Sequence, residues 1–507
     1  MLFEVDYKRG IYAGLKNSAT AFPDRIALIC GAQRFSYREL INRVDHVAST
    51  LGKEYSKVDR IALHLNNCSD AVVVALAVAQ LGKILIPLNP ALRKPQLLTQ
   101  IEATQAQLVI TTQAGVKFWH KLTTSLPCLC SEELLGEQVA TIQEIQQDIS
   151  RPYLVTSSSG STGKPKPIVL SQRSKLQRSK QAADCYSITN NDVILCASPF
   201  YHSLGQRLVF LPLLHGATLV LLEHFSANAW LTSVRQHKVT FTIAVASHLQ
   251  ALERDLIKRD SDLNSLRCLV SSSTAINKTL KHSLMENLGC EFHEMYGATE
   301  IATATNLTPL QAHHKPDSVG SPLPGVKILI LNDKHQSLMA NHTGEIAVET
   351  PLQFNGYLNE DQLTSQSYHE GYFLTGDLGY LDEHGYLYFV SRKKDIIITG
   401  GINVVPSDIE KEINAFPGIK ECCVIATMHE YLGEAVLAVC VAENDTVPDS
   451  GYLQGLRLSL NETLAGFQQP RYFVFVDAVP LTSSGKPDKE ILRKTYCHYS
   501  DAGEAHG

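Results

Sequence analysis

The sequence predicts an α/β protein, with a large N-terminal domain of sheets and flanking helices and a small α+β domain at the C-terminal end. The chain of 507 residues is too long for one ordinary hydrophobic core, so two or more domains are expected. Strand patterns alternate with helical patterns in the first part of the chain, which is typical of largely parallel sheets covered by helices. After Gly371 the pattern changes, and a hairpin is followed by a self-contained set of strands and helices.

Local patterns predict the elements of the large domain. Ser36 is expected to cap a helix, because apolar residues at helical spacing follow it. A buried helix is expected over Ser69–Gln80, and its apolar run is too short to cross a membrane, which takes about 20 residues. Strands are expected over 60–65, 83–88, 107–111, 152–155, 217–222 and 239–244.

The small domain has a pattern of its own. Residues 382–385 are expected to form the turn of a hairpin. Beyond it, helices are expected over 407–415 and 452–464, and strands over 421–426, 435–441 and 471–476. The predicted domains are therefore residues 1–391 and 396–507, joined by a hinge at residues 392–395. A ligand site is expected in the cleft between two such domains.

Composition excludes several classes of partner. The net charge is -6, the isoelectric point is near 6.3, and no run of like charge stands out, so neither nucleic acid nor a membrane surface is an expected partner. The N-terminus carries acids where a signal peptide carries bases. The 12 cysteines include no Cys-x-x-Cys pair, which favours reduced thiols in the cytoplasm over zinc or a disulfide framework.

A loop rich in hydroxyls, glycines and lysines follows the strand predicted at 152–155. Glycines let backbone N–H groups turn toward an anion, hydroxyls add donors, and lysines neutralise charge, so the loop is expected to hold phosphate. It is not a Walker A loop, because Ser158 and Pro165 stand where that motif requires glycine and a hydroxyl residue. Prolines after its two lysines disfavour direct entry into a helix. The expected phosphate-binding residues are Thr156, Ser157, Ser158, Ser159, Gly160, Ser161, Thr162, Gly163 and Lys164.

This loop resembles the phosphate loop of the adenylate-forming superfamily, which contains acyl-CoA and aryl-CoA ligases, stand-alone adenylation enzymes and beetle luciferases. The resemblance implies the adenylate-forming enzyme fold, in which the small C-terminal domain is mobile. The segment Met295–Glu300 is a second match. There the resemblance implies that Tyr296, beside Gly297, stacks on adenine, that Thr299 contacts the α-phosphate region, and that Glu300 holds Mg²⁺. A carboxylate suits that ion, and a flat ring suits a flat base.

Further matches follow in the family's order. The resemblance implies that Asp377 binds the ribose hydroxyls, that Arg392 reaches ribose or phosphate, and that Lys394 is the hinge residue. It also makes Lys486 the catalytic lysine, which binds the substrate carboxylate and the α-phosphate as charge builds in the transition state. Coenzyme A is expected to enter near Gly400 and Gly401.

The acid pocket is the least defined part of the resemblance. Its expected lining residues are His202, Ser272, Ser273 and Ala298, and His248 is a further candidate. The segment around His202 lacks the acid that amino-acid-activating domains use to pair with an α-ammonium, so an α-amino acid is disfavoured. The chain departs from many relatives at several positions, which are the two serines, Ala246-Ser247, Ile402 and Gln468-Gln469.

The predicted activity is ATP-dependent activation of an aryl or short to medium acyl carboxylic acid to an acyl-adenylate, with release of pyrophosphate. Transfer to a thiol follows, and the expected cofactors are ATP, Mg²⁺ and coenzyme A. One alternative acceptor is the phosphopantetheine arm of an acyl carrier protein. An alternative of another class is luciferase-like oxidation of the acyl-adenylate. A non-catalytic nucleotide-binding relative is disfavoured, because Glu300, Asp377, Arg392 and Lys486 are all present.

Overall fold

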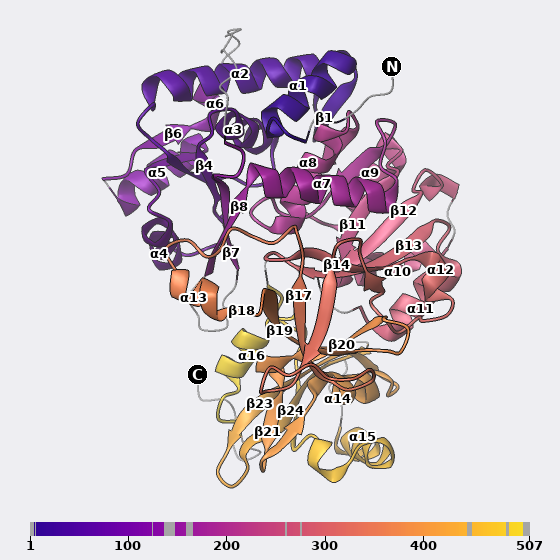
Figure 1. The fold of residues 1–507 in the computed structure, drawn as a ribbon. Coiled ribbons are helices and arrows are strands. Elements are labelled where there is room, and N and C mark those ends of the chain that lie inside the picture. Colours follow the sequence, from indigo (N-terminus) through magenta and orange to yellow (C-terminus); the bar gives the residue numbers. More distant parts are fainter. Residues whose placement is uncertain are drawn as a thin grey trace. The chain divides into compact units, whose positions relative to one another are not determined.

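The computed structural model describes residues 5, 7–123, 125–135, 148–158, 166–258, 261–273, 276–443, 449–482 and 486–499. The chain divides into two compact units. The first comprises Met1–Lys327 and Val348–Phe373, and the second comprises Ile328–Ala347 and Leu374–Gly507. The strands in the described ranges form four sheets (Figure 1). The predicted α/β class is confirmed.

A nine-stranded sheet runs through the first unit, in the order β15-β14-β13-β12-β11-β9-β10-β1-β2. The six strands from β13 to β1 in this order are parallel, and the strands added at the two edges are antiparallel. Parallel strands with helices on their faces require apolar residues on both sides, which explains the continuous apolar runs in the sequence. The strands are β1 (Ile26–Cys30), β2 (Gln33–Ser36), β9 (Val193–Cys196), β10 (Thr218–Leu221), β11 (Phe241–Val245), β12 (Cys268–Ser272), β13 (Glu291–Ala298), β14 (Ala302–Leu307) and β15 (Ser321–Pro322).

A six-stranded sheet in the same unit carries the phosphate loop. Its order is β6-β5-β3-β4-β7-β8, and β8 is antiparallel to β7. The loop therefore joins two strands of a hairpin and does not open into a helix, as the two prolines predict. The strands are β3 (Arg60–His64), β4 (Ile84–Pro87), β5 (Leu108–Thr111), β6 (Cys128–Cys130), β7 (Pro152–Ser158) and β8 (Lys166–Ser171).

Helices cover these sheets (Figure 1). Ser36 caps α2 through a reciprocal bond with Glu39, and α3 spans Ser69–Gln80 and is buried along its length, so both predictions are confirmed. No helix in the described ranges is long and apolar enough to span a bilayer. The helices are α1 (Ile11–Ala21), α2 (Tyr37–Glu54), α3, α4 (Lys94–Thr104), α5 (Gln113–Leu122), α6 (Ser131–Leu134), α7 (Gln172–Tyr186), α8 (Ser203–Leu214), α9 (Ala227–His237), α10 (Ala246–Ile257), α11 (Lys278–Asn287), α12 (Pro309–Ala312) and α13 (Asp361–Gln366).

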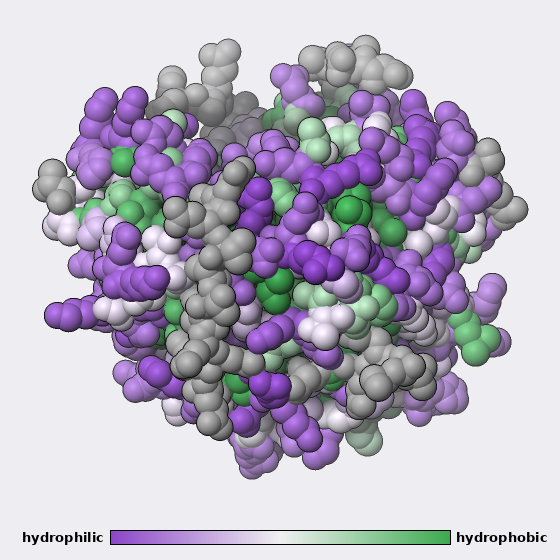
Figure 2. All heavy atoms as spheres, turned by 90° about the horizontal axis from the view of Figure 1, so that it is seen from above, coloured by the Kyte–Doolittle hydropathy of each residue, from purple (hydrophilic) through white to green (hydrophobic). Residues whose placement is uncertain are grey.

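Two apolar clusters lie on these sheets. One gathers around β11 and β12 under α9 to α11 and contains Trp230, and the other gathers around the six-stranded sheet and contains Trp119. Both tryptophans, which are the two in the sequence, have no exposed surface. On the face seen in Figure 2, hydrophilic residues dominate and hydrophobic ones form small separate groups. Apolar area is thus concentrated inside the molecule.

The second unit contains the predicted hairpin and the small α+β pattern. In the hairpin, β19 pairs antiparallel with β20, and Gly385 in the turn has a φ of 79°. The last sheet has the order β22-β21-β24-β23, with β25 parallel to β24. The elements that lie in this unit or extend into it are β16 (Lys327–Leu331), β17 (Gly344–Glu349), β19 (Tyr372–Leu381), β20 (Leu387–Arg392), β21 (Ile397–Thr399), β22 (Ile402–Val404), β23 (Ile419–His429), β24 (Gly433–Ala442), β25 (Tyr472–Phe475), α14 (Pro406–Asn414), α15 (Ser450–Thr463) and α16 (Lys489–Thr495). The short strand β18 (Tyr368–His369), which pairs with β19, belongs to the first unit.

The second unit also includes residues 374–391, which the sequence analysis assigns to the large domain. Residues Lys393–Asp395, within the predicted hinge, form a short 3-10 helix. A hinge describes a rotation, so its position at 392–395 stays a prediction.

Candidate active site

The phosphate loop leaves the six-stranded sheet at the end of β7. Thr156 is buried there, and its hydroxyl donates to the carbonyl oxygen of Tyr201 at 2.8 Å. This bond ties the start of the loop to the segment that precedes α8. Ser157 is partly buried. The predicted residues Ser159, Gly160, Ser161, Thr162, Gly163 and Lys164 lie outside the described residues, and Ser158 is described through its backbone pairing with Lys166.

The Tyr296 to Glu300 motif occupies the tight hairpin between β13 and β14. A Cβ atom at Gly297 would lie 2.0 Å from the carbonyl oxygen of Ala302, so a side chain at this position would push the strands apart. Ala302 itself has a φ of 63°, in the left-handed region. Tyr296 is buried, while Ala298, Thr299 and Glu300 are partly exposed. The hairpin therefore presents the last three residues of the motif at the carboxyl end of β13.

The Glu300 carboxylate is held by one tyrosine. The Tyr357 hydroxyl donates to Oε1 of Glu300 at 3.0 Å. Burial raises the pKa of Glu300, and the positive charges of Lys166 and Arg178 oppose that shift. Lys166, the first residue after the loop, lies 5.5 Å from the centre of the Tyr357 ring. The Glu300 carboxylate is thus held in place by Tyr357, close to Lys166 at the start of β8.

Arg178 holds this hairpin through hydrogen bonds to its backbone. No sequence motif pointed to this arginine. This residue of α7 is 4% exposed. Its guanidinium donates to the carbonyl oxygens of Thr299 at 2.8 Å, Glu300 at 3.3 Å and Leu352 at 2.7 Å. Burial and the nearby Arg207 lower the pKa of Arg178 to about 9. Three backbone carbonyls bonded to one buried cation fix the position of the motif.

His202 stands at the N-terminus of α8, in the first unit. It is the residue that precedes the helix, and its ring centre lies 4.6 Å from that of Tyr201. Glycine is required at Gly205, because a Cβ atom there would lie 2.1 Å from the carbonyl oxygen of Pro199. The tight turn into α8 thereby fixes where His202 and Ser203 lie.

The two serines predicted in the acid pocket end β12. Ser272 is buried, and Ser273 has a φ of 74°, a conformation that favours glycine. Their hydroxyl oxygens lie 3.4 Å apart. His248, the further pocket candidate, stacks on Phe225 with ring centres 3.6 Å apart, and burial lowers its pKa to about 4.

In the second unit, predicted residues from the hairpin and the far C-terminal segment lie together. Asp377 of β19 faces Arg392 of β20, with 3.6 Å between Oδ1 and Nε. The pKa of Lys486 is about 8, well below its ordinary value. Burial and the nearby cations Arg392 and Lys394 lower this pKa, and the negative charge of Asp377 opposes the shift. The structure therefore brings four predicted site residues within electrostatic reach of one another.

Gly400 and Gly401 form the turn between β21 and β22, also in the second unit. Their φ values are 55° and 81°, and the N–H of Gly400 donates to the carbonyl oxygen of Leu432 at 2.9 Å. The positive φ values of this turn are sufficient to explain why both positions are glycine. Binding of coenzyme A at this turn stays a prediction.

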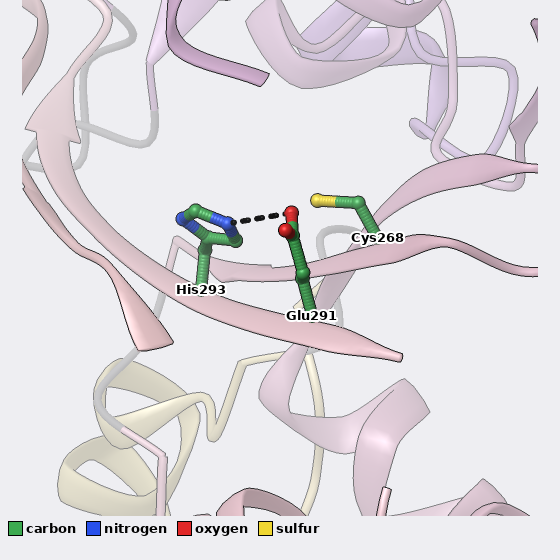
Figure 3. Close-up of side chains that lie close together, drawn as sticks. All are labelled: Cys268, Glu291 and His293. Atoms are coloured by element: carbon green, nitrogen blue, oxygen red, sulfur yellow. Dashed lines mark ion pairs between the residues drawn. The ribbon is translucent and has the colours of Figure 1, made fainter. Parts of the chain in front are cut away.

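A further cluster of side chains lies at the opposite end of the parallel strands. Cys268 of β12 and Glu291 and His293 of β13 have ligand atoms within 4.8 Å of one another (Figure 3). Nε2 of His293 lies 3.6 Å from Oε2 of Glu291. Glu291 and Cys268 face each other at the start of their strands, whereas the Tyr296 to Glu300 motif ends β13. This cluster is therefore separate from the nucleotide motif.

Comparison with known proteins agrees with these observations. Residues 15–358 match the AMP-binding enzyme family, and residues 408–486 match the C-terminal domain of AMP-binding enzymes. The chain belongs to the AMP-binding enzyme family. The predicted superfamily is thereby confirmed.

Similar members of the AMP-binding enzyme family are CoA ligases. The chain is 30% identical to an indoleacetate–CoA ligase of Aromatoleum aromaticum, over 95% of this chain and 96% of the relative. It is 30% identical to a 2-succinylbenzoate–CoA ligase of Bacillus velezensis, over 92% of this chain and 94% of the relative. A solved structure of o-succinylbenzoate CoA synthetase from Bacillus subtilis with its acyl-adenylate has a TM-score of 0.86 at 28% identity, covering 97% of this chain and 99% of that one.

These matches support the predicted class of activity. The chain is an acid–thiol ligase of the AMP-binding enzyme family that uses ATP and coenzyme A on a small carboxylic acid. The similarity extends over almost the whole chain and includes both family segments. The matches leave the acid undefined.

Proposed function

We propose that this AMP-binding enzyme activates an aryl or short to medium acyl carboxylic acid and transfers it to coenzyme A. A carboxylate oxygen attacks the α-phosphorus of ATP in line, pyrophosphate leaves, and the thiol then attacks the acyl-adenylate. The acids in the names of the two relatives, indoleacetate and 2-succinylbenzoate, are aryl acids without an α-amino group, which agrees with the absence of an acidic residue beside His202. Unpaired thiols at all 12 cysteines suit a reducing cytoplasm.

The observation that carries the proposal is the group of charges around Lys486. Its amine lies within reach of Arg392, Lys394 and Asp377, in surroundings that lower its pKa to about 8. An ammonium that lies among other cations is strongly stabilised when a carboxylate and a phosphate approach it, because both groups bring negative charge. We propose that Lys486 stabilises the transition state of adenylate formation, that Asp377 binds the ribose hydroxyls, and that Arg392 binds ribose or phosphate.

The residues present fit a Mg²⁺ ion. Glu300 offers a hard oxygen donor, and Oε2 remains for a cation because Oε1 accepts the bond from Tyr357. Burial raises the pKa of Glu300, so a bound cation would favour its charged form. We propose that Glu300 holds the ion, which when bound would neutralise charge on the phosphates.

Thioester formation requires an acceptor thiol. We propose that it enters near Gly400 and Gly401 after the small domain turns about Lys394, because one face of a site cannot hold Lys486 and the thiol together. The relatives support coenzyme A as the acceptor, and the alternatives to be tested against it are a carrier-protein phosphopantetheine and luciferase-like oxidation. Thioester formation measured with each acceptor, beside oxygen consumption, separates the three.

The test compares the two half-reactions in Lys486→Ala. Acid-dependent exchange of pyrophosphate into ATP is expected to fall by at least about a hundredfold, whereas thioester formation from supplied acyl-adenylate is expected to persist. The matched control is Lys494→Ala, an exposed lysine that pairs with Glu490 on α16. Equal loss of both half-reactions in Lys486→Ala would remove this lysine from its proposed role. In the same assays, Lys394→Pro is expected to retain exchange and lose thioester formation, and normal overall turnover would contradict the hinge.

A further inference from the structure

A cavity lies between α7 and α8 in the first unit, which pack side by side (Figure 1). The cavity is narrow: of about 280 Å³ of empty space, which includes the part that opens to solvent, only about 10 Å³ admits a sphere the size of a water molecule. Six residues line it, and three of them are cations. This "cationic cavity" is lined by Lys175, Arg178, Ser179, Ser203, Arg207 and Phe210.

The cations of the cationic cavity lack negative partners. In the described part of the chain, none of Lys175, Arg178 and Arg207 forms an ion pair with an acidic side chain. Lys175 is 4% exposed, and its amine donates to the neutral amide oxygen of Gln206 at 2.8 Å. Arg207 donates to the Thr303 hydroxyl at 2.8 Å and contacts the sulfur of Met295. The three cations are therefore hydrogen-bonded to neutral groups, and the nearby negative charge of Glu300 acts on Arg178 without a direct ion pair.

Donors that line this space or lie beside it have no partner among the described residues. The Ser179 hydroxyl, in a residue that is 3% exposed, and the Nε2 amide of Gln206 are buried without a hydrogen bond. Lys175 carries three N–H groups and Arg207 five, more than their bonds use. A buried polar group without a partner is costly, and more so beside like charges. The cavity is thus suited to a group that accepts several hydrogen bonds and is negatively charged.

The cationic cavity adjoins the predicted acid site. Ser203 follows His202 directly, and Arg178 bonds the carbonyl oxygens of Thr299 and Glu300. Arg207 reaches Thr303 of β14, the strand that follows the motif. The lining arginines of the cavity therefore contact the same hairpin that carries Thr299, where the reacting carboxylate is proposed to lie.

We propose that the cationic cavity binds a second carboxylate of the substrate, so that the enzyme prefers dicarboxylic acids. This inference rests on the proposed function and names its substrate class. A guanidinium can bond a carboxylate through two parallel N–H groups, and the Lys175 amine adds a third charge-assisted bond. Burial and the two arginines lower the pKa of Lys175 well below its ordinary value, and a bound carboxylate would oppose that shift and favour the charged amine. Because the free space admits about one water molecule, entry of a carboxylate would require the lining side chains to move apart.

The test measures acid-dependent pyrophosphate exchange with aliphatic and aryl dicarboxylic acids, each beside its monoamide, and with monocarboxylic aryl and fatty acids. Charged hydrogen bonds of the usual strength predict that kcat/KM for the favoured diacid exceeds that for its monoamide by about 10- to 100-fold. Lys175→Met and Arg207→Met should each lower this ratio by about tenfold or more. The matched control, Arg173→Met on the exposed side of α7, should leave it unchanged.

The outcomes separate this inference from the function on which it rests. Good exchange with monocarboxylic acids and no preference for diacids would overturn the inference and leave the proposed function intact. Exchange with no acid on the panel would contradict the proposed function itself. A raised KM for ATP in Lys175→Met, with an unchanged ratio of diacid to monoamide, would assign the cavity to the nucleotide and also overturn the inference. Thermal unfolding of each variant checks that it is folded.

Discussion

Two buried lysines in the first unit have opposite surroundings. Lys281 of α11 is 3% exposed, forms an ion pair with the buried Glu294 of β13, and donates to the carbonyl oxygen of Ser318 at 2.8 Å. Lys175 of α7 is 4% exposed and faces two arginines and a neutral amide. The protein thus compensates one buried charge internally and leaves the other uncompensated. The difference indicates that Lys281 has a structural role and that Lys175 is placed for a ligand.

The largest expected effect is a loss of stability when the ion pair between Lys281 and Glu294 is broken. Lys281→Met would leave Glu294 buried without its cation, and the free energy of unfolding should fall by about 3 to 5 kcal/mol. The measurement is urea denaturation followed by tryptophan fluorescence. Trp119 and Trp230 are the two tryptophans of the sequence and lie buried in the first unit, so the signal reports that unit alone. A loss below about 1 kcal/mol, the range of exposed ion pairs, would contradict a structural role for the pair.

Lys486 extends the comparison to the second unit, since it too lies among cations. Its pKa of about 8 means that the amine is charged below that pH and loses its charge as the pH rises through it. The rate of acyl-adenylate formation in single turnovers should therefore hold below pH 8 and fall by up to about tenfold for each pH unit above it. Bound phosphate would raise the apparent pKa. A rate that increases through this range would show that the neutral amine is the active form.

The smallest expected effect distinguishes Lys175 from Lys281 most clearly. The substitution is the same, a lysine to methionine, but the expected change in the free energy of unfolding has the opposite sign. Lys175→Met removes a buried cation that lies beside two others. The free energy of unfolding should stay unchanged or rise by about 1 kcal/mol. This gain in the free energy of unfolding should shrink as the pH rises toward 10.5. The pKa of Lys175 is lower in the folded state than in the unfolded state, so wild-type folding is penalised only at a pH where the unfolded lysine is still charged. Destabilisation by Lys175→Met, measured by the same fluorescence, would place both lysines in one structural class.

Local chemistry explains why much of the fold could be predicted. The Ser36 cap, the helix Ser69–Gln80 and the hairpin turn at 382–385 depend on neighbouring residues, and each forms where the sequence places it. The prolines after the two lysines of the phosphate loop likewise disfavour direct entry into a helix, and the strand β8 follows the loop instead.

The cationic cavity depends on packing, which the sequence expresses weakly. Lysine and arginine are usually exposed, so Lys175 and Arg178 on α7 suggest a solvated face until α8 covers them. Arg207 gave a usable signal, because it is the one charged residue in the otherwise apolar helix Ser203–Leu214. The pairing of Lys281 with Glu294 joins two elements, and spacing along the chain does not reveal it. Motifs therefore supplied the predicted nucleotide residues, whereas the cationic cavity became visible only in the structure.

The most direct test of the account is a crystal structure with a sulfamate analogue of the acyl-adenylate, carrying the diacid that gives the highest kcat/KM. The account predicts that the distal carboxylate lies in the cationic cavity, with oxygens about 2.7 to 2.9 Å from the Lys175 amine and the Arg207 guanidinium. A distal carboxylate that points away from both cations, with the space between α7 and α8 left unfilled by the ligand, would contradict it.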